Sequence, residues 1–453
     1  MAPTAAMALN GVAPAGLVGR AVPLAFIFAA VGVLFVAYAF IRLSRYFTHA
    51  GSVYALSGVT LGPQAGFFAG WALLGTYLAF TCASTAEAGA FGVAFLQSTG
   101  IAHNPDYIWI ALGAAVFVAA LAFGDIRNAT RALLSCEGIS VVFIVILMIV
   151  IVAKLIGGSP PNHQTITANA FSIPAGTSFT AVASAAVFGF LSFGGFEGAA
   201  ALGEETQNPR REIPRAIRTA VIATGIFYVL CILIQTWGFG ATTAGAKAFA
   251  SSTAPLGDLA QSYVGSWMAD VINAGATISA FASGLGAAVA GGRILFALSR
   301  QTPLERLLGR TSTRTGAPVP ALLIVLIIGI GAIVVQRLAG VSATNAFFYP
   351  GTIGVLSLLV AYMVTNVGAI SFLFIRARRA PLYEIVVPVL GIVFLGYTIY
   401  KNVVGVSFPY SRFPLWVGIW LGVGLVFILA QPRLAARIGA ALAQDEGLQA
   451  SSA

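Results

Sequence analysis

The stretch FGFLSFGGFEG, residues 188–198, is the most informative part of this chain. It reads as an apolar helix, yet two adjacent glycines, Gly194 and Gly195, interrupt it, and Glu197 follows. Glycine lowers the cost of leaving helical geometry. Inside a membrane, a non-helical backbone is tolerated where it is buried in protein or lines a cavity. The stretch therefore predicts a helix that breaks beside an internal site; the alternative is that the glycines only let a neighbouring helix pack closely.

Composition places this stretch in a membrane protein. The 453 residues are 58% hydrophobic and only 8% charged, whereas soluble domains carry about 25% charged residues. Runs of about 20 apolar residues, each long enough to cross a bilayer, recur along the whole chain. The net charge of +10 comes from arginines scattered over short loops, which does not favour a nucleic-acid partner. We predict an all-α polytopic protein whose surroundings are the lipid bilayer.

Eleven apolar runs are expected to be complete spans. They cover residues 23–43, 66–97, 107–124, 134–156, 178–201, 216–239, 267–298, 319–336, 346–375, 384–400 and 413–430. Residues 1–20 form a shorter apolar stretch before them. Successive spans cross the membrane in opposite directions, so this stretch should run toward the outside. We therefore expect that the sequence begins within a truncated first helix, in a protein of about twelve transmembrane helices.

Basic residues predict the orientation, because cytoplasmic loops carry an excess of lysine and arginine. If the loop 44–65 is cytoplasmic, 18 of the 24 basic residues fall on that side. The other six lie outside or near the outer ends: Arg20, Lys154, Lys247, Arg337, Lys401 and Arg412. We therefore expect a multi-pass protein of the cell membrane whose C-terminal tail, residues 431–453, is cytoplasmic.

Three features suggest where a site lies. Glu197 is an acid at membrane depth, and such groups usually face an interior or an aqueous path; the alternative is a structural acid that stabilises the broken helix. At the N-terminus, Pro3 interrupts helical hydrogen bonding, and two interrupted helices are a pointer to a transporter's central site. A polar stripe on one helical face either lines a cavity or satisfies its neighbours; it consists of Tyr77, Thr81, Ser84 and Glu87.

Four loop motifs carry a resemblance to a known family. They are HAGSVY (49–54), GFEGAAALGEETQNPRREIPRAI (195–217), GGRILFALSR (291–300) and GAPVP (316–320). With these in order over nearly the whole chain, the sequence resembles permeases of the amino acid–polyamine–organocation superfamily. The resemblance implies the LeuT-like fold of two inverted five-helix repeats, here about 1–156 and 178–375, and two additional helices, 384–430. It also implies secondary active transport of amino acids or related amines.

The resemblance further implies which residues bind substrate. In relatives, the first-helix break commonly reads Gly-Ser-Gly and holds the substrate carboxylate by backbone amides; the matching region here reads PTAAM (3–7) and departs from that pattern. Together with the sixth helix and the stripe, the predicted substrate-binding residues are Pro3, Thr4, Ala5, Ala6, Met7, Tyr77, Thr81, Phe190, Leu191, Ser192, Phe193, Gly194, Gly195 and Glu197.

The coupling ion is left open between a proton and sodium. Some proton-coupled relatives carry a lysine in the fifth helix, and the comparable stretch SCEGISVV (135–142) has none. The predicted coupling residues are Glu197, Ser140 and Ser283. Phe190, Leu191 and Phe193 suggest a pocket for an apolar-to-medium substrate side chain, while Glu197 allows a cationic amino acid or an amine.

Two other function classes compete with a carrier. A channel also uses broken helices. A membrane-embedded enzyme needs a nucleophile–base pair or metal ligands at membrane depth, and the isolated His49, His103 and His163 show no metal-ligand spacing. We therefore expect no catalytic residues, no metal and no cofactor.

Overall fold

A computed structural model describes residues 2–47, 52–103, 105–123, 126–299, 304–312 and 316–445. Within these ranges the protein is helical and has no β-strand. The beginning of the HAGSVY motif, residues 49–51, lies outside the described residues, as do Arg300 at the end of GGRILFALSR and residues 446–453 of the tail.

Most elements follow one another closely, and a longer connection with the 3₁₀-helix η2 (Ala168–Phe171) joins α7 to α8. The first half of the chain contains α1 (Pro3–Leu9), α2 (Val12–Val18), α3 (Val22–Leu43), α4 (Ser52–Leu61), α5 (Pro63–Ser98), α6 (Tyr107–Phe123), α7 (Ile126–Ile156), α8 (Phe179–Phe193), the 3₁₀-helix η3 (Phe196–Glu205) and α9 (Pro209–Phe239). The second half contains α10 (Thr243–Ser251), α11 (Pro255–Tyr263), α12 (Ser266–Ser299), α13 (Glu305–Leu308), α14 (Val319–Leu338), α15 (Ala343–Ile370), the π-helical η4 (Ser371–Arg376), α16 (Val386–Val403), α17 (Phe413–Leu429) and α18 (Pro432–Asp445).

The predicted spans coincide with these helices. Ten helical stretches in the described residues are long and apolar enough to cross a membrane, the first of them running from α1 to the end of α3. The predicted span 107–124 is the short helix α6, whose 17 residues fall just below that length. The prediction of an all-α polytopic membrane protein is confirmed, while the inverted repeat stays a prediction.

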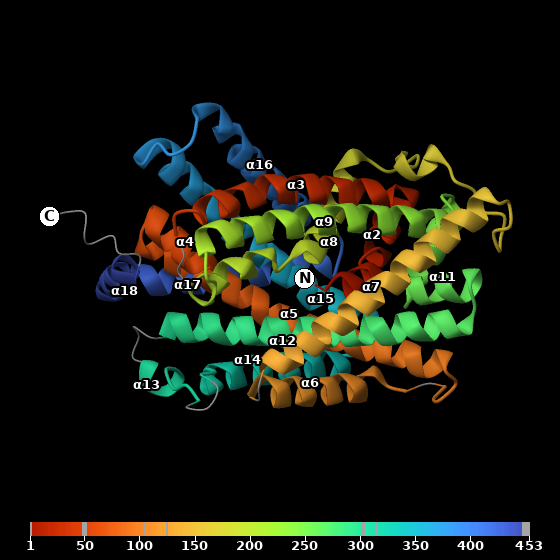
Figure 1. Cartoon of the computed structure of the whole chain (residues 1–453), viewed down its shortest axis with the longest axis horizontal. Helices are drawn as coiled ribbons and strands as arrows, with labels where there is room; N and C mark the ends of the chain where they lie inside the picture. Colours follow the sequence, from red (N-terminus) through yellow and green to blue (C-terminus); the bar gives the residue numbers. More distant parts are fainter. Residues whose placement is uncertain are drawn as a thin grey trace.

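The long helices run side by side around a central α5, which contacts α4, α6, α12, α14, α15 and α17 (Figure 1). The short helices α4, α13 and α18 gather at one end of the molecule, and α11 lies at the other. In the sequence, α4, α13 and α18 belong to segments that the basic residues place on one side of the membrane. Their common end agrees with the predicted alternation of loops.

The break predicted from Gly194 and Gly195 is confirmed. Helix α8 ends at Phe193, and Gly194 turns the chain out of helical geometry with ψ 133°. Gly195 then adopts φ +108°, a conformation that side chains other than glycine rarely adopt. The chain continues as η3 rather than as an α-helix. A Cβ atom at Gly194 would also lie 2.8 Å from the Phe80 ring, so both glycines are needed.

The interruption predicted around Pro3 is wrong in position. Residues 3–7 belong to the regular helix α1, and Pro3 occupies its first turn, where its missing N–H has no partner to lose. The chain leaves the α-helix at a turn formed by Asn10 and Gly11, between α1 and α2. A Cβ at Gly11 would lie 2.3 Å from the Phe249 ring, so glycine permits that close contact.

A reciprocal tryptophan pair fastens α17 to α5. The indole N–H of Trp71 donates to the carbonyl oxygen of Trp420 at 2.8 Å, and Trp420 donates to that of Trp71 at 3.0 Å. The two rings stack with centroids 4.4 Å apart. Each ring lies against a glycine of the other helix, because a Cβ at Gly75 or Gly424 would meet an indole within 2.4 Å.

Candidate functional site

A small cavity lies where α8 breaks. Its volume is about 50 Å³, and α1, α5, α8, α12 and α15 contribute to its walls. The lining residues are Ala2, Ala5, Ala6, Asn10, Phe80, Ala83, Ser84, Glu87, Leu191, Ser192, Gly194, Ser283 and Phe347. Segments more than 300 residues apart in sequence therefore meet at one point, beside the predicted break.

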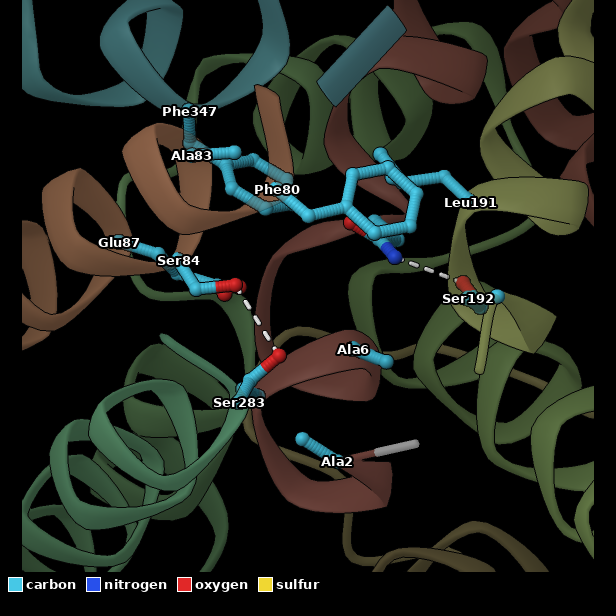
Figure 2. A pocket seen from close by; sticks show the side chains of 13 residues that line it. Ala2, Ala6, Phe80, Ala83, Ser84, Glu87, Leu191, Ser192, Ser283 and Phe347 are labelled. Atoms are coloured by element: carbon cyan, nitrogen blue, oxygen red, sulfur yellow. Dashed lines mark hydrogen bonds between the residues drawn. The ribbon is translucent and has the colours of Figure 1, made fainter. Parts of the chain in front are cut away.

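The cavity has polar and apolar walls. In Figure 2, Ser84, Glu87 and Ser283 lie on one side and Leu191 and Ser192 on the other. Ser84 donates a hydrogen bond to Ser283 at 3.0 Å. The apolar lining includes Phe80 and Phe347, besides Leu191 and the alanines. Such a mixture of apolar walls and a few placed polar groups is typical of small-molecule sites.

Glu87 is the acid of the cavity. Among the lining residues that the structure describes, it is the one ionisable side chain. Its exposed fraction is 3%, and its Oε1 atom has no hydrogen-bond partner. Glu137 of α7 is close enough to interact with it electrostatically. A buried acid with an open acceptor is suited to a positively charged or hydrogen-donating ligand.

The first amides of α1 are already bonded to side chains. The Thr4 N–H donates to Oε1 of Glu137 at 2.8 Å, and the Ala5 N–H donates to the hydroxyl oxygen of Ser279 at 3.0 Å. Glu137 and Ser279 belong to α7 and α12, so these bonds hold the start of α1 against two long helices.

Glu197 lies in a separate, fully buried cluster. Its carboxylate accepts hydrogen bonds from the Tyr77 hydroxyl at 3.0 Å, the Tyr362 hydroxyl at 2.5 Å and the Gly195 N–H at 2.9 Å. Its backbone carbonyl accepts from the Ser52 hydroxyl at 2.9 Å. The left-handed Gly195 turns the chain so that the acid can reach back to that N–H. The cluster links α4, α5, α15 and the broken α8, but Glu197 does not line the cavity.

The structure divides the predicted site residues. Those that line the cavity are Ala5, Ala6, Leu191, Ser192, Gly194 and Ser283. Those outside its lining are Pro3, Thr4, Met7, Tyr77, Thr81, Ser140, Phe190, Phe193, Gly195 and Glu197. Thr81 and Ser140 donate to carbonyls of their own helices, those of Tyr77 and Cys136. The Phe193 ring packs on Tyr228.

The polar stripe of α5 is divided in the same way. Ser84 and Glu87 line the cavity, whereas Tyr77 bonds to Glu197. Phe80 and Ala83 are lining residues that the sequence analysis does not predict. They lie seven and four residues before Glu87, a spacing that places all three on one helical face, so the sequence contains a signal for them. Asn10 was also missed; its amide donates to Ser192 at 2.7 Å. Phe347 carries no local sequence signal.

Comparisons with known proteins agree with this architecture. The family model described as amino acid permease matches residues 4–427. The chain is 27% identical to the branched-chain amino acid permease BcaP of Lactococcus lactis over 69% of this chain and 68% of that protein. It is 28% identical to BcaP of Bacillus subtilis, over 62% and 60% respectively.

A relative with a different named substrate matches over a shorter region. The low-affinity putrescine importer PlaP of Escherichia coli is 30% identical over 49% of this chain and 48% of its own length. The family match covers nearly every helix described above, including the broken α8. The chain therefore belongs to the amino acid permease family and is a membrane permease.

Proposed function

We propose that this protein is a secondary active transporter that carries amino acids or related amines across the cell membrane by alternating access. The observation that carries the proposal is the cavity at the break of α8. Substrate sites of carriers lie at such discontinuous helices near the middle of the membrane. The relatives support the substrate class, since their names include permeases for branched-chain amino acids and an importer of putrescine.

The cavity itself offers the first test. Ala83→Trp places a large ring in a space of about 50 Å³ and should abolish exchange of substrate. Val116→Trp is a suitable control, because Val116 lies on α6 with 67% of its side chain exposed. Both variants would be reconstituted in liposomes and assayed by counterflow of radiolabelled amino acids and amines. Full exchange by Ala83→Trp would contradict a substrate site in this cavity.

The same assay separates a carrier from a channel. A carrier alternates between two faces, so its flux saturates and is stimulated by substrate on the opposite side. A channel lacks this stimulation. A membrane enzyme would change the substrate chemically, which mass spectrometry of the transported compound would detect. We expect saturable, trans-stimulated flux of an unaltered compound.

We propose Glu197 as the group that couples transport to a proton. It is fully buried, and its three hydrogen-bond donors come from α5, from α15 and from the break of α8. Glu197→Gln mimics the protonated acid, so this variant should retain exchange but lose the response to an imposed pH gradient. Sodium is the second candidate, with Ser283 of the cavity lining as a ligand; Ser140 lies outside that lining. Uptake that follows a sodium gradient and persists in Glu197→Gln would favour it.

A further inference from the structure

We propose that the cavity selects a primary amine without a carboxylate, and that Glu87 and Asn10 hold its ammonium group. This inference rests on the proposed transport function and names the substrate class within it. Both residues line the cavity, and both are at least nine-tenths buried, with exposed fractions of 3% and 2%.

The unpaired atoms of the cavity are acceptors. Oε1 of Glu87 and Oδ1 of Asn10 are buried without a hydrogen-bond partner. A buried acceptor left unpaired is costly, so a ligand that donates hydrogen bonds to these two atoms is favoured. An ammonium group supplies three donors and no acceptor. Its positive charge also matches the carboxylate of Glu87 in a region of low dielectric constant, where such attraction is strong.

A substrate carboxylate finds no positively charged partner among the described lining residues. The described lining contains no lysine, arginine or histidine. The N–H groups of Thr4 and Ala5 are occupied by Glu137 and Ser279. A second carboxylate would also be repelled by Glu87 and Glu137. Binding of an α-amino acid is therefore less favourable in free energy than binding of the corresponding amine.

The apolar walls receive the rest of the ligand. Leu191 faces Glu87 across the cavity in Figure 2, and Phe80 and Phe347 complete this surface. Hydrocarbon is favourable there because it removes apolar surface from water. The lining therefore favours an amine that carries an alkyl group, with its ammonium group between Glu87 of α5 and Asn10 at the end of α1.

Pairs of compounds that differ only by a carboxylate test the proposal. Leucine and isopentylamine form one pair, and ornithine and putrescine form another. Binding to the purified, full-length protein would be measured by calorimetry, and transport by counterflow. We expect each amine to bind at least tenfold more tightly than its amino acid. Glu87→Gln should weaken amine binding at least tenfold. It should also reduce the ratio between the affinities for the amine and the amino acid of each pair.

Glu212→Gln is the matched control, since Glu212 lies exposed on α9, outside the cavity. It should leave the affinities for the amine and for the amino acid unchanged. Thermal unfolding would verify that Glu87→Gln is folded. Tighter binding of leucine than of isopentylamine, or unaltered amine binding in folded Glu87→Gln, would overturn the inference while leaving a transporter. Absence of exchange for every amino acid and amine would instead overturn the proposed function.

Discussion

At the scale of single residues, Glu197 shows how a buried acid is kept in place. A carboxylate inside a membrane is tolerated when donors surround it, and here two tyrosine hydroxyls and one backbone amide fill that role. Tyr77 and Tyr362 are themselves buried, so each depends on the acid as much as the acid depends on it.

Removal of this acid should destabilise the protein more than removal of one donor. Glu197→Ala leaves both hydroxyls and the Gly195 amide without their acceptor, at a cost of about 1–3 kcal/mol for each unsatisfied group. Tyr77→Phe deletes a single hydrogen bond and should cost about 1 kcal/mol. Thermal unfolding in detergent would rank the two variants. Equal melting temperatures would mean that the carboxylate does not hold the cluster together.

At the scale of elements, the conformation of Gly195 makes the break in α8 a local property of the chain. The backbone must adopt φ +108° there before η3 can begin. The two glycines of the break then have different surroundings: Gly194 lines the cavity, and the N–H of Gly195 donates to the carboxylate of Glu197.

Gly195→Ala should therefore destabilise the protein, because a side chain at this φ costs about 1–3 kcal/mol. Gly198→Ala is the matched control three residues later, where an added Cβ meets nothing within 4 Å and φ is not positive. Thermal unfolding would compare the two. If both variants unfold at the same temperature, the backbone at residue 195 is not restricted as described.

The tryptophan pair permits a second comparison within one helix. Gly424→Ala places a Cβ 2.2 Å from the Trp71 ring, which must move and weaken its hydrogen bond to α17. Gly418→Ala, also on α17, meets nothing within 4 Å. We expect a loss of about 1–3 kcal/mol, typical of overpacking, for Gly424→Ala only. A melting temperature equal to that of Gly418→Ala would contradict the tight fit.

At the scale of the whole molecule, the loops sort into two ends. Helices α4, α13 and α18 share one end, and α18 contacts α4 and α5. From the basic residues we predict that this end lies in the cytoplasm and that the connection through α10 and α11 lies outside.

Cysteine labelling in intact cells would measure this orientation. In a background without Cys82, Cys136 and Cys231, Gln207→Cys and Leu307→Cys should resist a membrane-impermeant thiol reagent. Gln261→Cys, before α12, should react. All three positions are exposed. Labelling of Gln207→Cys from outside would reverse the orientation.

The sequence predicts those features of the fold and the site that depend on residues close together along the chain. The spans and the break of α8 follow from apolar runs and from a glycine pair, which neighbouring residues determine. The partners of Glu197 lie 120 and 165 residues away along the chain, so no local pattern reveals them. For the same reason, the sequence does not point to Phe347, nor does it show that Glu197 lies outside the lining of the cavity. In α1, proline was interpreted as a break, but at the first helical position it is compatible with a helix.

The reciprocal contact of Trp71 and Trp420 has a consequence for how transport is observed. Helix α5 supplies Phe80, Ala83, Ser84 and Glu87 to the cavity, and the two indoles tie α17 to it. Helix α17, on which Trp416 and Val426 are exposed, should then move as one rigid body with the α5 wall of the cavity. A probe on α17 can therefore serve as a fixed reference on α5, from which displacements of α1 and α8 during a transport cycle can be measured without placing a label in the cavity.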